Sequence, residues 1–386
     1  MSLSFQDVTK RYGETVALDG LSLDVAPKSF TVISGPPKSG KSVLFRLLVG
    51  LENPDSGRIM LDGRDISADA PADRPVGYVP QNFALYPHQT VAQNMGYPLT
   101  LAKFDKAEIE KRVDRTAGIL SITHLLKKTP DQLSGGEKQR VAVARGLLKD
   151  ASIFVLDDPL VGLDYKLRER LMDELKSLRD ELDATFVYAT SDSLEALTMA
   201  QNLAVIDEGR IIQHGVADEV YHQPSHYRTL DLIGFPHANL FEGAIEAGRV
   251  NAGPLHFLAP PGAGHEARIK AGLRPEHVHL DADATNTPGA AQPATGAITL
   301  PARVTLVENL GGEAVVYLDC GGHPLTAAMA LYDSPPPAIE SAVTVTIDPA
   351  KILLFDAATG DRLKSGGAMS LAAAQATLQR SFGTHG

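Results

Sequence analysis

An α/β domain followed by an all-β domain is the fold class that the sequence predicts. Up to about residue 235, apolar strand-like runs alternate with longer amphipathic segments, which is typical of α/β architecture. A short β-branched run, Phe30 to Ile33, leads directly into a glycine-rich loop. Beyond Phe235-Pro236, short valine-rich runs punctuated by Gly and Pro replace the helical pattern and indicate a small β-barrel or sandwich. We therefore expect two domains that meet near Pro236.

Local patterns predict the elements of the first domain. Helical spacing is expected over Val43 to Leu51, directly after the glycine loop, and over Asp105 to Ile122 within a helical subdomain at about 88–150. Ile59 to Leu61 followed by Asp62-Gly63 predicts a β-hairpin. The remaining expected elements are strands at 152–156, 185–190 and 202–206 and a helix at 165–180.

The second domain should be built from short strands. We expect strands at 302–307, 313–318 and 342–347, with an Ala-, Thr- and Pro-rich loop insertion at 282–297. The last residues, Ser365 to Gly386, contain an Ala-rich helical stretch in a polar tail. The predicted domain ranges are therefore 1–235 and 236–364, followed by a tail at 365–386.

The composition describes a globular chain rather than a membrane-spanning or nucleic-acid-binding one. The chain has 386 residues, 44% hydrophobic and 22% charged, which suits a soluble protein of two or more compact units. No apolar stretch approaches the ~20 residues that span a bilayer, and we expect no secretory leader. The net charge of −11 argues against broad nucleic-acid binding. Cys320, the only cysteine, fits a small buried residue in a reducing compartment, so we expect a cytoplasmic protein.

The glycine-rich loop at 35–42 matches the phosphate-binding pattern G-x-x-x-x-G-K-S. In such a loop, backbone N–H groups and the helix N-terminus cradle phosphates, Lys41 meets the outer phosphates and the Ser42 hydroxyl reaches Mg²⁺. The alternative, a chance Gly-rich turn, is disfavoured because strand, loop, lysine and helix are in the required order. The expected ATP-binding residues here are Gly35, Pro36, Pro37, Lys38, Ser39, Gly40, Lys41, Ser42 and Val43.

A second apolar run, Phe154 to Leu156, ends in Asp157 and Asp158. In P-loop ATPases a carboxylate at such a strand end helps to hold Mg²⁺. We therefore expect Asp157 to take that role and Asp158 to face the attacking water. Two aspartates at a strand end could instead cap the next helix, and this interpretation would be preferred if the glycine loop were absent.

The most specific string in the chain runs from Leu133 to Arg140 and reads LSGGEKQR. Ser134 and Glu137 have the spacing of a helix capping box, and the glycine pair lets backbone approach a ligand closely. The string is the signature motif of ABC ATPases, a family that the chain resembles. The resemblance implies that Ser134, Gly135, Gly136 and Glu137 contact the γ-phosphate of an ATP held by the other subunit of a dimer.

Other landmarks of the family then fall in order. Tyr12 stands where the family stacks an aromatic ring on adenine, and Gln81 matches the glutamine that touches Mg²⁺ and senses the permease. Phe83 to Pro87 resembles the surface that receives a permease coupling helix, and Leu163-Asp164 matches the end of the D-loop. The resemblance implies ATP and Mg²⁺ as cofactors, with Ser42, Gln81 and Asp157 as metal ligands.

The C-terminal third resembles the OB-type accessory region, called TOBE, of carbohydrate and polyol importers such as the maltose-importer ATPase family. The resemblance extends over about residues 1–362 and implies dimer contacts or regulation, but no chemistry, for this region. The strings that carry it are Asn239 to Gly243, Gly272 to Glu276, Val307 to Gly311 and Leu354 to Gly360.

The departures from the family gather around the γ-phosphate. Pro37-Lys38 replaces the usual Ser-Gly, Asp158 replaces a catalytic glutamate, Ser191 replaces the switch histidine, and the D-loop begins at Val161-Gly162. Misplacement by about 1 Å can cost on the order of 100-fold in rate. The expected catalytic residues are Lys41, Asp158 and Ser191. Because two of them depart from the family, we expect a site that binds ATP but hydrolyses it slowly.

These observations favour the energy-coupling subunit of an importer for a sugar, polyol or glycerol-like solute. We expect it at the cytoplasmic face of the membrane, with two transmembrane permease subunits and, indirectly, a solute-binding protein. Because the signature at Ser134 is intact, we expect a heterodimer with a different, catalytically standard ATPase. The alternatives are a structural or regulatory nucleotide-binding subunit and a slow homodimeric ATPase. Soluble ABC proteins of translation or DNA repair usually join two ATPase units or insert coiled coils, and neither is visible here.

Overall fold

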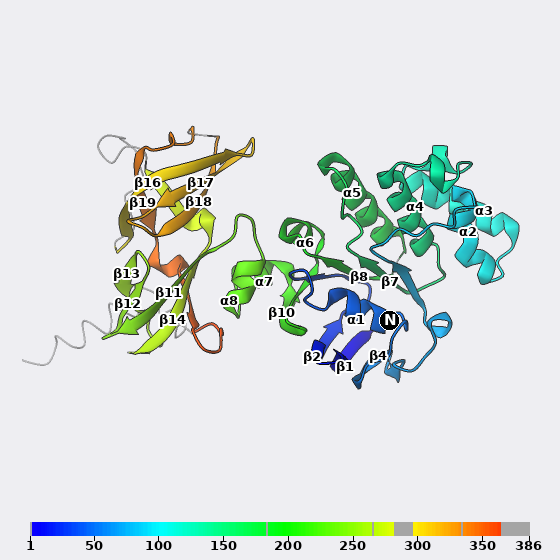
Figure 1. Cartoon of the computed structure of the whole chain (residues 1–386), viewed down its shortest axis with the longest axis horizontal. Helices are drawn as coiled ribbons and strands as arrows, with labels where there is room; N and C mark the ends of the chain where they lie inside the picture. The colour runs from blue at the N-terminus through cyan, green and yellow to red at the C-terminus, as the bar shows by residue number, and fades with distance from the viewer. Residues whose placement is uncertain (1, 183, 265, 282–295, 333–334, 364–386) are drawn as a thin grey trace, which may run out of the picture. The chain divides into compact units, whose positions relative to one another are not determined.

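The computed structural model describes residues 2–182, 184–264, 266–281, 296–332 and 335–363 (Figure 1). They form two compact units, Met1–Gln223 and Pro224–Gly386. The predicted insertion at 282–297, apart from its last two residues, and the predicted tail at 365–386 lie outside the described residues. The predicted domain boundary at 235 differs from this division because α8 (Tyr227–Leu232) packs on a strand of the second unit.

Two sheets enclose the core of the first unit. The larger has the order β10-β9-β3-β8-β7-β6, in which all neighbours pair in parallel except β10 and β9. The smaller is antiparallel, with the order β2-β1-β4-β5. Their bounds are β1 (Leu3–Tyr12), β2 (Thr15–Val25), β3 (Phe30–Ser34), β4 (Ser56–Leu61), β5 (Arg64–Asp65), β6 (Val76–Val79), β7 (Ile153–Asp157), β8 (Thr185–Thr190), β9 (Asn202–Asp207) and β10 (Arg210–Val216).

Helix α1 (Lys41–Leu48) lies in the core between these sheets. Its buried Leu44, Phe45 and Leu48 pack in one cluster with apolar side chains of both sheets. The helix starts two residues before the predicted Val43 because Gly40, in a left-handed conformation, ends the loop. It stops before the predicted Leu51, close to the left-handed Gly50. The order strand, loop and buried helix therefore fixes the position of the glycine loop.

Helices α3 and α5 lie where helices are predicted, α2 and α4 lie in the predicted helical subdomain, and α6 and α7 are additional. Figure 1 shows α2, α3 and α4 gathered as a helical subdomain at one end of the unit. The hairpin predicted at 59–63 is also present, with Asp62 and Gly63 both at positive φ as a tight two-residue turn requires. The bounds are α2 (Val91–Leu101), α3 (Lys106–Ile119), α4 (Gly135–Leu147), α5 (Tyr165–Leu182), α6 (Ser193–Met199) and α7 (Ala217–His222).

The second unit is built from two five-stranded antiparallel sheets, as the valine-rich runs predict. Their orders are β13-β12-β11-β14-β20 and β15-β19-β16-β17-β18, and side chains from both form one core that includes Cys320. The bounds are β11 (Asn239–Glu246), β12 (Arg249–Ala252), β13 (Leu255–Leu258), β14 (Ala267–Leu273), β15 (Val278–Asp281), β16 (Ile298–Asn309), β17 (Glu313–Asp319), β18 (Pro324–Ala330), β19 (Ala342–Ile347) and β20 (Leu353–Asp356).

Candidate nucleotide site

The glycine loop joins the end of β3 to the start of α1. Gly40 has a φ of +108°, and a Cβ there would lie 2.7 Å from the Ala17 carbonyl oxygen, so only glycine fits. No side chain caps the N-terminus of α1. The first-turn N–H groups, which have no intrahelical partner, therefore suit an anion such as a phosphate.

Lys41 is buried at the head of this helix. Its ammonium group donates to the carbonyl oxygens of Gly35, at 2.7 Å, and Pro36, at 3.0 Å. Burial lowers the pKa of Lys41, and the carboxylates of Asp158 and Asp157 act in the opposite direction. The cation thus stands between the loop carbonyls and two acidic groups, beside the free helix N-terminus.

Asp157 ends β7 with its carboxyl group buried. Its Oδ1 accepts from the Ser42 hydroxyl at 3.1 Å, and its Oδ2 lies 3.5 Å from the Tyr78 hydroxyl. Burial raises the pKa of Asp157, while the Ser42 hydrogen bond lowers it. The sequence predicts Ser42 and Asp157 as partners of one metal ion but gives no role to Tyr78.

The donor set fits Mg²⁺. Hydroxyl and carboxylate oxygens are the hard ligands that this ion takes, and Mg²⁺ usually binds through one or two carboxylates plus substrate phosphates. Within the described ranges, no group of three or more His, Cys, Asp or Glu side chains forms a metal cage. Ser42 and Asp157 would therefore hold an ion that arrives with the nucleotide, where it would neutralise phosphate charge.

Asp158 and Ser191, predicted to flank the γ-phosphate, lie together. The Ser191 N–H donates to Asp158 Oδ1 at 3.3 Å, and the Asp158 N–H donates to the Ala189 carbonyl oxygen at 3.0 Å. Asp158 has a φ of +46°, and burial raises its pKa, opposed first by the charge of Lys41. Ser191, at the position of the family's switch histidine, therefore contacts Asp158 through its backbone N–H and supplies an exposed hydroxyl instead of an imidazole.

A buried carboxylate lies beside the switch loop. Glu195, on α6, is 6% exposed and accepts a hydrogen bond from the Tyr188 hydroxyl. Its pKa is raised to about 7, chiefly by burial and also by the charge of Asp192, while the hydrogen bond from Tyr188 and the charge of Arg168 act in the opposite direction. Between the ordinary value of 4.5 and about 7, the folded chain thus holds a proton that the unfolded chain releases.

Stability should therefore fall as the pH rises through that window. Glu195→Gln keeps an acceptor for Tyr188 but cannot ionise, so its stability should change less between pH 5 and pH 8, by about 2 kcal/mol. Urea denaturation of both proteins at the two pH values measures this difference. Equal pH dependence in the variant and the original chain would contradict the assignment.

Lys38 has a backbone conformation that glycine adopts more easily than lysine. Its φ is +68°, in the left-handed region that costs L-residues about 1–2 kcal/mol. The neighbouring Pro37 is exposed, and the buried Ser39 hydroxyl has no hydrogen-bond partner. The loop therefore carries both strain and an unsatisfied polar group.

Lys38→Gly should consequently stabilise the chain by about 1 kcal/mol, since glycine adopts positive φ at no steric cost. Thermal or urea denaturation measures the gain. Lys28→Gly, at a φ of +56°, should behave alike. Lys111→Gly inside α3 should instead cost about 1 kcal/mol. The same sign for all three variants would show that backbone strain is not the cause.

Tyr12 and Gln81 occupy exposed positions. Tyr12 ends β1, is 43% exposed, donates its hydroxyl to Glu52 and lies 5.6 Å from the Lys10 ammonium. Burial and Glu52 raise the Tyr12 pKa to about 12. Gln81 follows β6, and among the described residues no hydrogen bond joins it to Ser42 or Asp157. The Tyr12 side chain is thus partly accessible, and the roles of Tyr12 and Gln81 toward ATP and Mg²⁺ stay predictions.

The signature forms the predicted capping box at the start of α4. The Glu137 N–H donates to Ser134 Oγ at 3.3 Å, and the Ser134 N–H donates to Glu137 Oε2 at 2.7 Å. A Cβ on Gly135 would meet nothing within 4 Å, so the chain is open there, whereas Gly136 is approached by Leu167. In the described part of the chain, no hydrogen bond joins residues 134–137 to the loop at 35–42.

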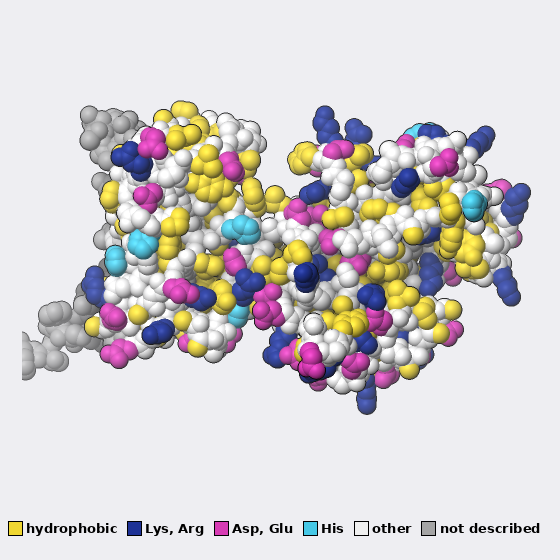
Figure 2. Space-filling view, viewed as in Figure 1, with side chains coloured by type: hydrophobic (Ala, Val, Ile, Leu, Met, Phe, Trp, Pro, Cys, Tyr) yellow, Lys and Arg dark blue, Asp and Glu magenta, His cyan; other side chains and the backbone are white. Residues whose placement is uncertain are grey.

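The segment from Phe83 to Pro87 lies at the surface beside the helical subdomain. Tyr86 is 42% exposed, its ring centroid lies 4.8 Å from that of Tyr97, and the Arg145 guanidinium lies 5.2 Å from the Tyr86 centroid. Asn94 fixes the Tyr86 backbone by bonding both its N–H and its carbonyl oxygen. Figure 2 shows apolar side chains at the surface around these helices. Tyr86 is therefore held by several neighbours while its ring stays accessible at the surface.

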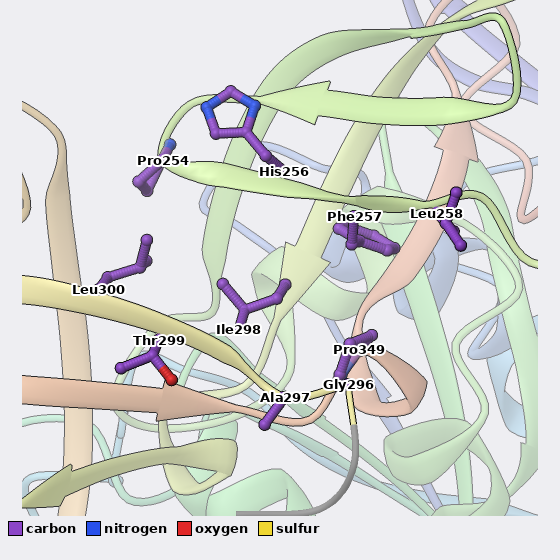
Figure 3. Close-up of a pocket in the computed structure, with 10 residues that line it drawn as sticks. All are labelled: Pro254, His256, Phe257, Leu258, Gly296, Ala297, Ile298, Thr299, Leu300 and Pro349. Carbon is purple, nitrogen blue, oxygen red and sulfur yellow. The ribbon is translucent and has the colours of Figure 1, made fainter.

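A cavity of about 530 Å³ lies in the second unit, at the edge strand β13 and the start of β16 (Figure 3). Its lining is mostly apolar, and its one ionisable side chain, His256, hydrogen-bonds Asn251. None of its lining residues belongs to the nucleotide motifs. The cavity therefore adds no chemistry to the site.

Comparison with known proteins identifies the family. Residues 18–161 match the family model described as ABC transporter, and residues 271–355 match the TOBE domain model. The sn-glycerol-3-phosphate import ATP-binding protein UgpC of Chromobacterium violaceum is 37% identical over 383 residues, which cover 97% of this chain and 98% of that protein. The chain belongs to the ABC transporter ATP-binding proteins.

Another relative and a solved structure are also similar to this chain. The xylose/arabinose import ATP-binding protein XacJ of Haloferax volcanii is 38% identical over 371 residues, covering 93% of this chain and 94% of its own. The dimeric, post-hydrolysis structure of the ATP-binding cassette MJ0796 with ADP and Pi has a TM-score of 0.51 and 29% identity, covering 56% of this chain and 98% of that one. The predicted family and fold class are confirmed. No helix in the described parts of this ABC protein is long and apolar enough to cross a membrane.

Proposed function

We propose that this ABC protein is the energy-coupling ATPase subunit of an importer for glycerol-3-phosphate, a sugar or a polyol. One observation carries the proposal: a phosphate loop, the Asp157 carboxylate and a complete signature occur in a chain that matches one import ATP-binding protein over 97% of its length and another over 93%. Its place is the cytoplasmic face of the membrane, with two permease subunits and a solute-binding protein.

The permease contact is assigned to the surface from Phe83 to Pro87. Exposed Tyr86, held by Tyr97, Arg145 and Asn94, gives a rigid aromatic anchor of the kind found at protein interfaces. The segment also follows the loop that carries Gln81, so a permease helix docked there could displace the glutamine. A movement of the permease would in this way reach the nucleotide site through Gln81.

The transport function is testable by uptake. Cells lacking this chain should lose import of one of three radiolabelled solutes, sn-glycerol-3-phosphate, xylose or glycerol, and regain it with the original gene but not with Tyr86→Ala. Unchanged uptake of all three in the deletion strain would contradict the proposed solute class. Purified chain should bind a fluorescent ATP analogue, and absence of binding would contradict the nucleotide assignment itself.

We further propose that the chain's own site is impaired and that its partner is a different, standard ATPase. Asp158 is one methylene shorter than a glutamate and is tied to the Ser191 N–H, while Ser191 supplies no imidazole. Lys38 strains the phosphate loop. The signature, in contrast, is fully formed around Ser134. A damaged phosphate site beside an intact signature is the pattern expected when the working ATP lies on the partner's loop.

Single-turnover measurements separate the remaining alternatives. A structural or regulatory subunit would bind ATP on the isolated chain and release it uncleaved, whereas a slow homodimer would cleave one bound ATP at a measurable rate. Brisk steady-state hydrolysis by the isolated chain would rule out an impaired site. Hydrolysis that appears only after addition of a second, co-encoded ATPase supports the heterodimer.

A further inference from the structure

The Tyr78 hydroxyl lies 3.5 Å from the second oxygen of the Asp157 carboxylate. Strands β6 and β7 are parallel, with Tyr78 paired to Val155, so Asp157 lies two residues further along β7 on the same face. The half-buried Tyr78 ring packs against the core cluster to which Val155 and α1 belong. The phenol thus extends along the face of the sheet toward the end of β7.

This contact completes a two-point hold on the carboxylate. Ser42 donates to Oδ1 at 3.1 Å from α1, and Tyr78 reaches Oδ2 from β6. The terminal torsion of an aspartate is otherwise broad, so a carboxylate held at one oxygen rotates easily. Two donors from two different elements fix its plane.

We infer that Tyr78 is a positioning residue for the metal ion of this site, which it serves by orienting the Asp157 carboxylate. The inference rests on the proposed ATP and Mg²⁺ chemistry and adds to it a residue outside the motifs. Hydrogen-bond partners of metal ligands set ligand orientation, and their loss typically weakens metal affinity about 10- to 100-fold. Because the Tyr78 contact is long, we expect the lower end of that range.

The test uses Tyr78→Phe, which removes the hydroxyl and keeps the ring in the core. Binding of Mn²⁺ to the full chain with ADP is followed by electron paramagnetic resonance, and ADP binding without metal by calorimetry. Metal affinity should fall roughly 10-fold, and metal-free ADP affinity should stay within about 2-fold. Tyr188→Phe is the matched control, because Tyr188 lies in the same sheet but its hydroxyl donates to Glu195 on α6. This variant should leave metal affinity unchanged.

If Tyr78 only supports the fold, Tyr78→Phe should weaken the binding of Mn²⁺ and of metal-free ADP together, and that result overturns the inference. Equal Mn²⁺ affinity in Tyr78→Phe and the original chain overturns it as well. A double-mutant cycle sharpens the distinction. In an Asp157→Asn background, Tyr78→Phe should have no further effect, and an additive loss would show that Tyr78 does not act through Asp157. If the original chain binds no nucleotide, the proposed function fails first and the inference fails with it.

Discussion

Replacing Ser134 by arginine should reduce the ATPase activity of the chain, assayed with the different, co-encoded ATPase proposed as its partner, by at least about 100-fold. Ser134 caps α4, and its neighbour Gly135 leaves the helix N-terminus open to an anion. An arginine there removes the cap, fills the open space and occupies the anion site. Lys41→Ala in the same pair should reduce activity by about half or less, because this chain's own phosphate loop serves the site that we propose to be impaired.

Asp105→Arg is the matched control for Ser134→Arg. Asp105 caps α3 by the same contact, accepting from the N–H three residues on at 2.9 Å, but lies outside every nucleotide motif. Loss of such a cap costs about 1 kcal/mol of stability and should leave activity near its original level. Complete loss of activity with Lys41→Ala and retention with Ser134→Arg would reverse the assignment of the two sites.

The sequence alone predicts the elements that local patterns determine. Strand β8 has the predicted bounds, Thr185 to Thr190, because it is a buried β-branched and aromatic run. The capping box of Ser134 and Glu137 was readable because both hydrogen bonds join residues three apart. The start of α1 at Lys41 depended instead on the left-handed Gly40, since helical periodicity alone suggests Val43.

Contacts between distant residues were beyond the sequence pattern. Tyr78 and Asp157 are 79 residues apart, and only the parallel register of β6 and β7 places them together. The family resemblance places Asp158 and Ser191 around one γ-phosphate, and the structure adds the hydrogen bond from the Ser191 N–H to Asp158. Likewise, the union of α8 with the second unit rests on long-range contacts, such as that of His226 with Asp361, that local patterns do not encode.

Restoring the family residues at three positions should activate the isolated chain. The variant combines Lys38→Gly, Asp158→Glu and Ser191→His, and its steady-state ATPase rate should exceed that of the original chain on the order of 100-fold. Glycine relieves the positive φ at 38, the longer carboxylate reaches one methylene further, and the imidazole supplies a proton-transfer group. Because a homodimer has two such sites, both become competent together.

Each substitution alone should give less than the combination, because groups that act on one transferred phosphate are coupled rather than additive. Adding Ser134→Arg to the triple variant should remove the gain, since the restored sites still need the signature of the facing subunit. Asp157→Glu, which lengthens the neighbouring carboxylate but breaks its bonds to Ser42 and Tyr78, should give no gain. A triple variant no faster than the original chain would place the defect elsewhere, with Pro37 and the D-loop at Val161-Gly162 as the remaining departures to exchange.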